Sequence, residues 1–359
     1  MSTEPAPDPE LSRELFLEWR SPRLGSANPE RIISPVWEWL VRSGIDAYQA
    51  NQRFSGPSAL SAGPGWCFAR FGQSSTELAD GRVVLIGGEH EDHYDPDFFI
   101  YNDVVVRHPD GRIDLFGYPR EVFPPTDFHS ATLVGDRVVI IGCLGYPADR
   151  RPGVTPVFIL DLSTLSISAV PSQGEAPGWI HAHQARLCDG GGSIVIERGL
   201  LERGDPDRSL VENIDDFRFS LADGCWTRLT DRRWPRFEVR RSDGGPNRLW
   251  ELQQALWAER FPDIEAFRQQ QPSAPADLEL YQRRYQPPVA HEALPEVEDE
   301  YGVHRIRVQG IVVRYVEKTY SVQMTVEGPL PPETVDALAQ DLFAKLSQLE
   351  GARSELVSL

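Results

Sequence analysis

A short apolar run that recurs at a fixed interval constrains the fold of this 359-residue chain more than any other feature. The run Arg82–Ile86 reappears as Arg137–Ile141, 55 residues later, and a third version occupies Ser193–Ile196. This alignment brings Ile86, Ile141 and Ile196 into one register. Self-similarity at such a period is typical of repeat architectures, in which each copy forms one supersecondary unit.

Each copy contains further strand-like segments around the apolar run. A turn that tolerates positive φ precedes the run at Asp80-Gly81, at Gly135-Asp136 and at Asp189-Gly190. One strand-like segment lies before each turn and two follow the run, and the last of these in the third copy contains Trp226. Because four short antiparallel strands make up one propeller blade, residues 66–231 are predicted to form at least three four-stranded sheets.

The first copy ends its apolar run with Gly87-Gly88 and continues into Tyr101–Val104, and this order of motifs resembles the kelch repeat of bacterial-type kelch proteins. The second copy matches less well because Cys143 follows Gly142, and the third has Glu197-Arg198 at the glycine positions. The resemblance implies a mostly-β, propeller-like fold. Three blades are too few to close a ring, so either flanking strands complete it or the array is open.

The segments outside the repeats differ in composition from the repeats. Residues 1–65 are expected to form a helical arm and linker, 232–300 a connector of helices and loops, and 301–359 a small α+β unit. The tryptophans of the arm, including Trp37 and Trp39, either pack against the repeats or form a recognition surface. An edge strand of the C-terminal unit could pair with a second copy of the chain.

The charge and the termini exclude several classes of protein. The formal net charge of −18 disfavours binding to nucleic acids and anionic membranes. The first ten residues lack the features of a signal peptide, and no apolar run is long enough to span a membrane, so a cytoplasmic location is expected. The four cysteines have no CxxC spacing, and a disulfide framework is not expected.

Histidines and carboxylates in the repeats are candidate metal ligands. The segment Glu89–Asp97 concentrates them directly after the glycine pair, and two further histidines begin strands at corresponding positions of the second and third copies. Such side chains bind divalent metals, although their spacing fits no defined motif. The candidate ligands are His90, His93, Asp95, His129 and His183. A solvated acidic loop and structural histidines are the alternative interpretation.

The sequence favours a non-catalytic role. It contains no nucleophile elbow, zinc-protease motif, P-loop or dinucleotide fingerprint. The preferred hypothesis is a protein-interaction module that binds a basic partner through its loops, without a required cofactor. The acidic residues expected to contact this partner are Glu89, Glu91, Asp92 and Asp97. A metal-dependent enzyme is the alternative, followed by a toxin-neutralising or structural scaffold protein.

Overall fold

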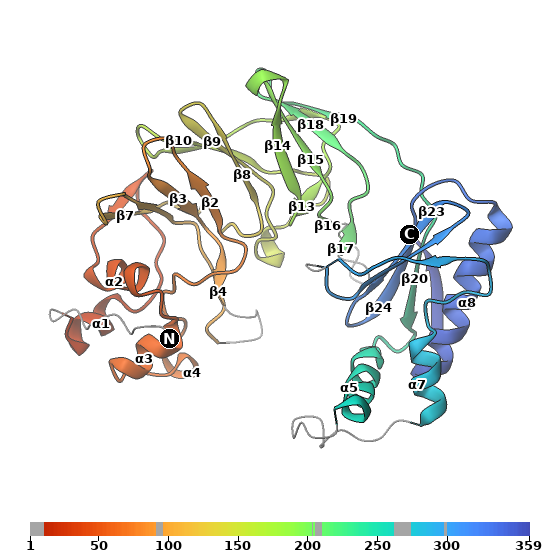
Figure 1. The fold of residues 1–359 in the computed structure, drawn as a ribbon. Coiled ribbons are helices and arrows are strands. Elements are labelled where there is room, and N and C mark those ends of the chain that lie inside the picture. Colours follow the sequence, from red (N-terminus) through yellow and green to blue (C-terminus); the bar gives the residue numbers. More distant parts are fainter. Residues whose placement is uncertain (1–10, 91–95, 203, 205–209, 262–273, 298–299) are drawn as a thin grey trace. The chain divides into compact units, whose positions relative to one another are not determined.

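The structure is a computed structural model that describes residues 11–90, 96–202, 204, 210–261, 274–297 and 300–359. It is rich in antiparallel β-sheet and divides into two compact units, residues 1–232 and 233–359 (Figure 1). The four predicted segments therefore combine in pairs. The arm belongs to the repeat unit, and the helices of the connector belong to the C-terminal unit.

Three sheets, one per sequence copy, form the body of the first unit and lie side by side in Figure 1; their strands pair antiparallel except for β12, which runs parallel to β19 in the third sheet. The first sheet contains β1 (Glu30–Ile32), β7 (Ile113–Gly117), β6 (Val104–Arg107), β3 (Val83–Ile86) and β2 (Ser74–Glu77). The second contains β11 (Ile167–Ala169), β10 (Val157–Asp161), β9 (Arg137–Ile141) and β8 (Ser130–Val134). The third contains β12 (Gln173–Gly174), β19 (Cys225–Arg228), β18 (Phe217–Ser220), β15 (Ser193–Glu197) and β14 (Gln184–Cys188).

Two smaller sheets are formed by segments that lie between the strands of these three. β4 (Glu89–His90) pairs with β5 (Phe99–Ile100), and a further sheet contains β13 (Trp179–His181), β16 (Leu200–Glu202) and β17 (Leu210–Glu212). The apolar segment that begins at Phe99 therefore forms two strands, β5 and β6. The break at 101–103 occurs where Tyr101 and Asp103 turn toward Trp66 and Arg70.

Alternation of side chains along the strands determines how the sheets stack. In β3, Val84 and Ile86 point toward the second sheet and pack on Val138 and Ile140, whereas Leu85 points the opposite way. The other face of the second sheet, which includes Ile141, packs on the third sheet. Both faces of the first and second sheets are thus apolar, and each requires a cover.

Equivalent backbone positions link each copy to the next. Gly72, Phe128 and Ala182 all have positive φ, and their peptides are connected in series, because Phe128 N–H donates to Gly72 O and Ala182 N–H to Phe128 O. Side chains repeat this connection, since His129 Nε2 bonds to Ser74 Oγ at 2.7 Å and His183 Nε2 to Ser130 Oγ at 2.8 Å.

The third copy is shifted by one residue relative to the sequence alignment. Ile86 and Ile141 each precede a glycine with positive φ, but in the third copy the residues with matching φ are Arg198 and Gly199. Ile196 is fully buried, yet it points back toward the second sheet, and Glu197 occupies the position equivalent to Ile86 and Ile141.

This shift explains how the row of sheets ends. The outer face of the third sheet carries Glu197, paired with Arg186 at 3.1 Å, and Arg218, which lies 3.8 Å from Asp189. Val195 is paired with Arg186 on one neighbouring strand and with Arg218 on the other, and the side chains of these two arginines cover it. A charged face does not need the cover that an apolar sheet face requires, so the sequence of sheets can stop here.

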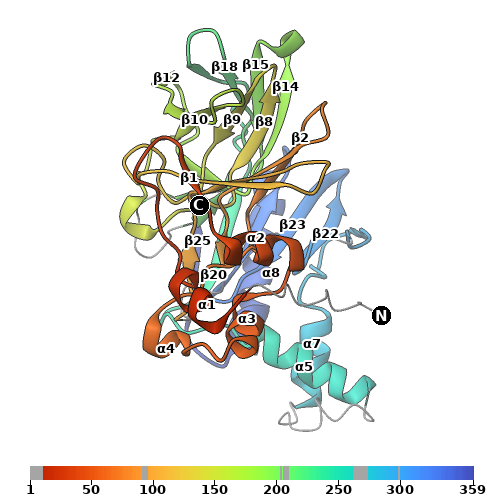
Figure 2. The same ribbon diagram turned by 90° about the vertical axis from the view of Figure 1, so that its left-hand side faces the viewer.

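The helical arm covers the opposite end of the row. The arm contains α1 (Arg13–Trp19), α2 (Pro35–Ser43), α3 (Ala47–Arg53) and α4 (Ala59–Ala62). Trp37 is buried, stacks on Trp66 with ring centroids 4.7 Å apart, and belongs to the same core as Leu85 and Val105 of the first sheet. The four helices group together in Figures 1 and 2, with α2 next to β7 of the first sheet. Trp37 and Trp39 are buried in this core, which is one of the two alternatives expected.

A buried ion pair fastens the segment that follows the arm to the first sheet. Arg70, whose side chain is fully buried, forms two hydrogen bonds to the Asp103 carboxylate, at 2.5 and 2.9 Å. Trp66 Nε1 donates to the same carboxylate at 3.0 Å, and the guanidinium lies 3.4 Å from the centre of the Tyr101 ring. The buried charges thus have the hydrogen bonds that make such a pair tolerable in a core.

The second unit is a six-stranded antiparallel sheet with helices on one face. Its strands are β21 (Glu292–Ala293), β22 (Val303–Val308), β23 (Ile311–Glu317), β24 (Ser321–Val326), β20 (Arg236–Arg241) and β25 (Ser354–Ser358). α5 (Leu249–Arg260), α7 (Pro275–Gln282) and α8 (Pro332–Glu350) share its core. Across the described residues, no helix combines the length and hydropathy needed to cross a membrane.

Removing one partner of the buried pair should destabilise the first unit strongly. Asp103→Ala leaves the Arg70 charge buried without its carboxylate, and we expect a loss of about 3–5 kcal/mol in the free energy of unfolding. Glu175→Ala, which removes an exposed partner of Arg228, should cost less than about 1 kcal/mol. Urea denaturation of the full chain measures both, and equal effects would contradict the assigned role of the pair.

Candidate functional site

The predicted metal ligands do not form a metal site in the part of the chain that the structure describes. His90 is buried in β4, His129 and His183 bond to serines of the preceding copy, and His93 and Asp95 lie outside the described residues. No three His, Cys, Asp or Glu side chains among the described residues are grouped as ligands.

His129 and His183 are held in the neutral form by their surroundings. Burial lowers the pKa of His129 to about 3, with a further contribution from His183, and burial lowers the pKa of His183 to about 4, with a contribution from His181. Among the described residues, the Nδ1 atoms of His129 and His183 have no hydrogen-bond partner. Through their hydrogen bonds to Ser74 and Ser130, both rings link neighbouring sheets, which is a structural role.

The acidic segment after the first apolar run is only partly described. Glu89 lies in β4, and Asp97 accepts a hydrogen bond from Gly65 N at 3.4 Å. Glu91 and Asp92, the other two predicted partner-binding residues, are outside the described residues. The glycines Gly87, Gly88 and Gly142 have structural roles, since Gly87 and Gly142 approach Thr126 O and Ile180 O too closely for a side chain.

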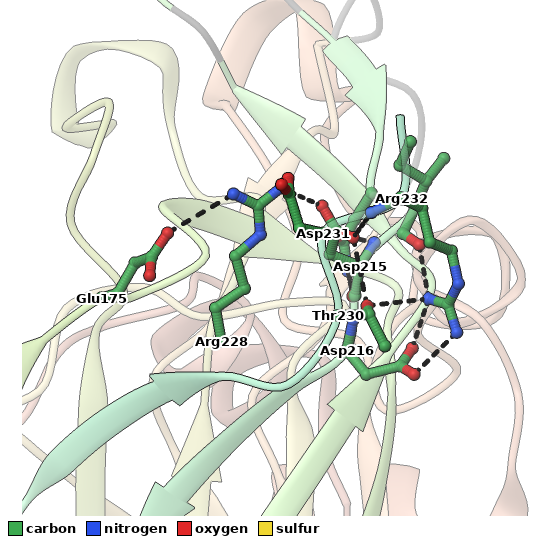
Figure 3. Close-up of polar contacts among 9 residues, drawn as sticks. Glu175, Asp215, Asp216, Arg228, Thr230, Asp231 and Arg232 are labelled. Carbon is green, nitrogen blue, oxygen red and sulfur yellow. Dashed lines mark hydrogen bonds and ion pairs between the residues drawn. The ribbon is translucent and has the colours of Figure 1, made fainter. Parts of the chain in front are cut away.

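A second cluster of charges closes the third sheet (Figure 3). Arg232 binds both carboxylate oxygens of Asp216 at 2.8 Å, and Asp215 accepts hydrogen bonds from Arg228, Thr230 and the Arg232 backbone. Burial alone would raise the pKa of Asp215, but these hydrogen bonds outweigh it and lower the pKa. With each carboxylate bound to an arginine, the cluster braces the chain where the third sheet ends.

The candidate functional site is a pocket of about 510 Å³ in the first unit, here called the loop pocket. One wall is the segment 120–125 after the first sheet, and the other is the loop and strand 143–158 of the second copy. Trp179 of β13 and Ala169 of β11 complete the lining. The apolar lining side chains are Val122, Pro124, Pro125, Val154, Pro156, Phe158 and Trp179.

Cross-links between the two walls hold the loop pocket open. Arg120 on one wall pairs with Asp149 on the other at 2.5 Å, and its guanidinium lies 5.7 Å from the centre of the Tyr146 ring. Tyr146 in turn accepts a hydrogen bond from Ile100 N at 3.0 Å, and Trp179 Nε1 donates to Leu144 O at 3.0 Å. A pocket fixed in this way loses little entropy when it is filled.

The described lining of the loop pocket is largely apolar. Cys143 contributes the only thiol among the described lining residues of the pocket. Burial raises the pKa of this thiol, so it stays protonated. No histidine lines the pocket in the described structure. Val154 is 49% exposed at the rim, which offers an apolar contact to an incoming ligand.

Sequence reasoning missed the loop pocket because its parts come from distant segments. Arg120, Val154, Ala169 and Trp179 belong to four separate stretches of the chain, and none of these stretches contains a recognisable motif. The closest signal is the run of prolines at 124–125 with Pro156, which marks rigid loops at one end of the sheets.

Comparisons with known proteins add little to this description. No family model matches the chain, and no curated protein matches it. Among solved structures, a match titled "Structure of YjhT" has a TM-score of 0.30 and 12% sequence identity. It covers 49% of this chain and 55% of the matched chain, so the alignment spans about half of each. A similarity of this size assigns neither a fold nor a function.

The buried histidines should make the stability of the first unit depend on pH. The folded pKa of His183, about 4, lies below its unfolded value of about 6.5, so the unfolded state binds more protons between these values. The stabilisation is complete above about pH 6.5 and is lost as the pH falls toward 4. Each such histidine should contribute a slope of about 1.4 kcal/mol per pH unit there.

The variant His183→Gln tests this expectation. Glutamine does not titrate, and Gln73 occupies the equivalent position in the first copy. Urea denaturation at pH 7, 6 and 5 should show a shallower loss of stability in the variant than in the wild type. Identical slopes would show that His183 is not neutral in the folded state.

Proposed function

We propose that the chain is a protein-interaction module whose kelch-like, propeller-like row of sheets holds a partner protein at the loop pocket. The observation that carries this proposal is the pocket itself, a cross-braced concavity with an apolar floor and an exposed apolar rim at Val154. A concave, largely apolar pocket can receive an anchoring side chain, and such anchors supply most of the affinity of protein interfaces.

The charge of the chain supports a basic partner. A net charge of −18 attracts basic proteins from a distance, and complementary potentials accelerate encounter and disfavour acidic competitors. The hairpin of β4 and β5 follows the glycine pair into the acidic segment, and Ile100 of this hairpin bonds to Tyr146 beside the loop pocket. Acidic residues and the apolar anchor site therefore belong to neighbouring elements of the first unit.

A charge placed at the pocket rim should abolish partner binding. Val154→Asp puts a carboxylate where an apolar side chain would be buried, and we expect at least a tenfold loss of affinity for the partner. Leu187→Asp is the control, because Leu187 is 41% exposed on β14 and does not line the pocket. The partner is first captured and identified, and affinity is then measured with purified proteins by calorimetry. Equal losses in both variants would contradict binding at the pocket.

Salt should act on the association rate. Screening limits electrostatic attraction to about 8 Å at physiological ionic strength, so added salt should slow association by about tenfold while dissociation changes little. Surface plasmon resonance at several salt concentrations separates the two rates. An acidic partner, or an association rate that is insensitive to salt, would remove the electrostatic part of the proposal.

A further inference from the structure

Two charged groups at the rim of the loop pocket have no charged partner. Glu121 lies on the wall formed by residues 120–125, and Arg151 lies on the wall formed by residues 143–158. Both are exposed, and within the described ranges neither side chain forms an ion pair or a hydrogen bond. Arg120 and Asp149, from the same two walls, neutralise each other at 2.5 Å.

We propose that the loop pocket is a dipolar clamp for a partner segment in which an apolar side chain lies between a basic residue and an acidic residue. The apolar side chain fills the floor made by Phe158, Pro156 and Trp179. The basic residue pairs with Glu121 and the acidic residue with Arg151. This inference rests on the proposed function and specifies the chemistry of the segment that occupies the pocket.

The two unpaired charges, Glu121 and Arg151, lie on opposite walls of the pocket. The Arg120–Asp149 brace uses one charge of each sign, so one anion and one cation remain for a ligand. A bound segment removes water from the rim, and a charge left unpaired there costs free energy. A segment with one charge of each sign satisfies both groups.

The same arrangement discriminates against other segments. A segment with basic residues on both sides would place one of them against Arg151, and a segment with acidic residues on both sides would place one against Glu121. A segment bound in the reverse direction would meet like charges at both ends. Repulsion of this kind gives an interface its specificity and its polarity. The net charge of −18 thus favours a basic partner protein, whereas the two rim charges determine which segment of that partner binds in the pocket.

Exchange of the two rim charges tests the clamp. Phage-displayed libraries of short linear peptides are selected on the immobilised full chain and on the double variant Glu121→Arg with Arg151→Glu. The wild-type chain should enrich peptides with an apolar residue between one basic and one acidic residue, in one order along the peptide. The double variant should enrich the opposite order.

A matched double exchange controls for surface charge in general. Asp136→Arg with Arg137→Glu exchanges an exposed pair in the turn between β8 and β9, outside the lining of the pocket. This variant should enrich the same peptides as the wild type. Against a synthetic wild-type consensus peptide, Glu121→Arg alone and Arg151→Glu alone should each weaken binding by about tenfold. The doubly exchanged chain should bind the reversed peptide within about threefold of the wild-type affinity.

The outcomes separate this inference from the proposed function. If the selected peptides lose affinity for Val154→Asp but show no charge pattern, or keep their order on the exchanged chain, the clamp is wrong and the anchor pocket remains supported. If the affinity of the selected peptides does not depend on Val154, the loop pocket is not their binding site, and both proposals fail.

Discussion

The structure of the first unit depends on the need to cover both faces of each apolar sheet. Val84 and Ile86 on one face of the first sheet, and Leu85 on the other, would each expose hydrocarbon to water if that face had no neighbour. The second sheet covers one of these faces and the arm covers the other. The row can end at the third sheet because Glu197 stands where the first two copies have isoleucine.

The arm therefore functions as part of the repeat unit rather than as a separate domain. It takes the place that a preceding sheet would occupy in a longer row, and its tryptophans supply the large apolar surface that such a sheet would bring. The arm also contributes β1, which pairs with β7 at the edge of the first sheet, and Arg31 of this strand forms an ion pair with Asp114. The buried Arg70–Asp103 pair fixes the segment that follows the arm, with Trp66 and Tyr101 completing the enclosure.

The sequence predicted those elements whose residues are close together in the chain. The three copies, the helical arm and the α+β character of the C-terminal segment follow from local patterns, and the structure contains them. The sequence did not reveal the one-residue shift of the third copy, because the shift appears only in the pairing of β15 with β14 and β18. In that pairing Glu197, not Ile196, takes the position equivalent to Ile86 and Ile141. Similarly, β20 contains four charged residues in six, so its interior place between β24 and β25 in the sheet of the second unit could not be read from hydropathy.

The loop pocket arises from the same requirement for cover, at the ends of the strands rather than on their faces. The connections between copies must return from one sheet to the next, and the segment 120–125 and the loop 143–156 do so side by side. Arg120, Asp149 and Tyr146 fix these connections to each other and to β5, so their apolar side chains cannot collapse together. The cavity between them persists because its walls are held by polar contacts, and those contacts leave Glu121 and Arg151 available at the rim. In our proposal, recognition of a partner thus depends on the connections, while the regular spacing of the copies serves the stacking of the sheets.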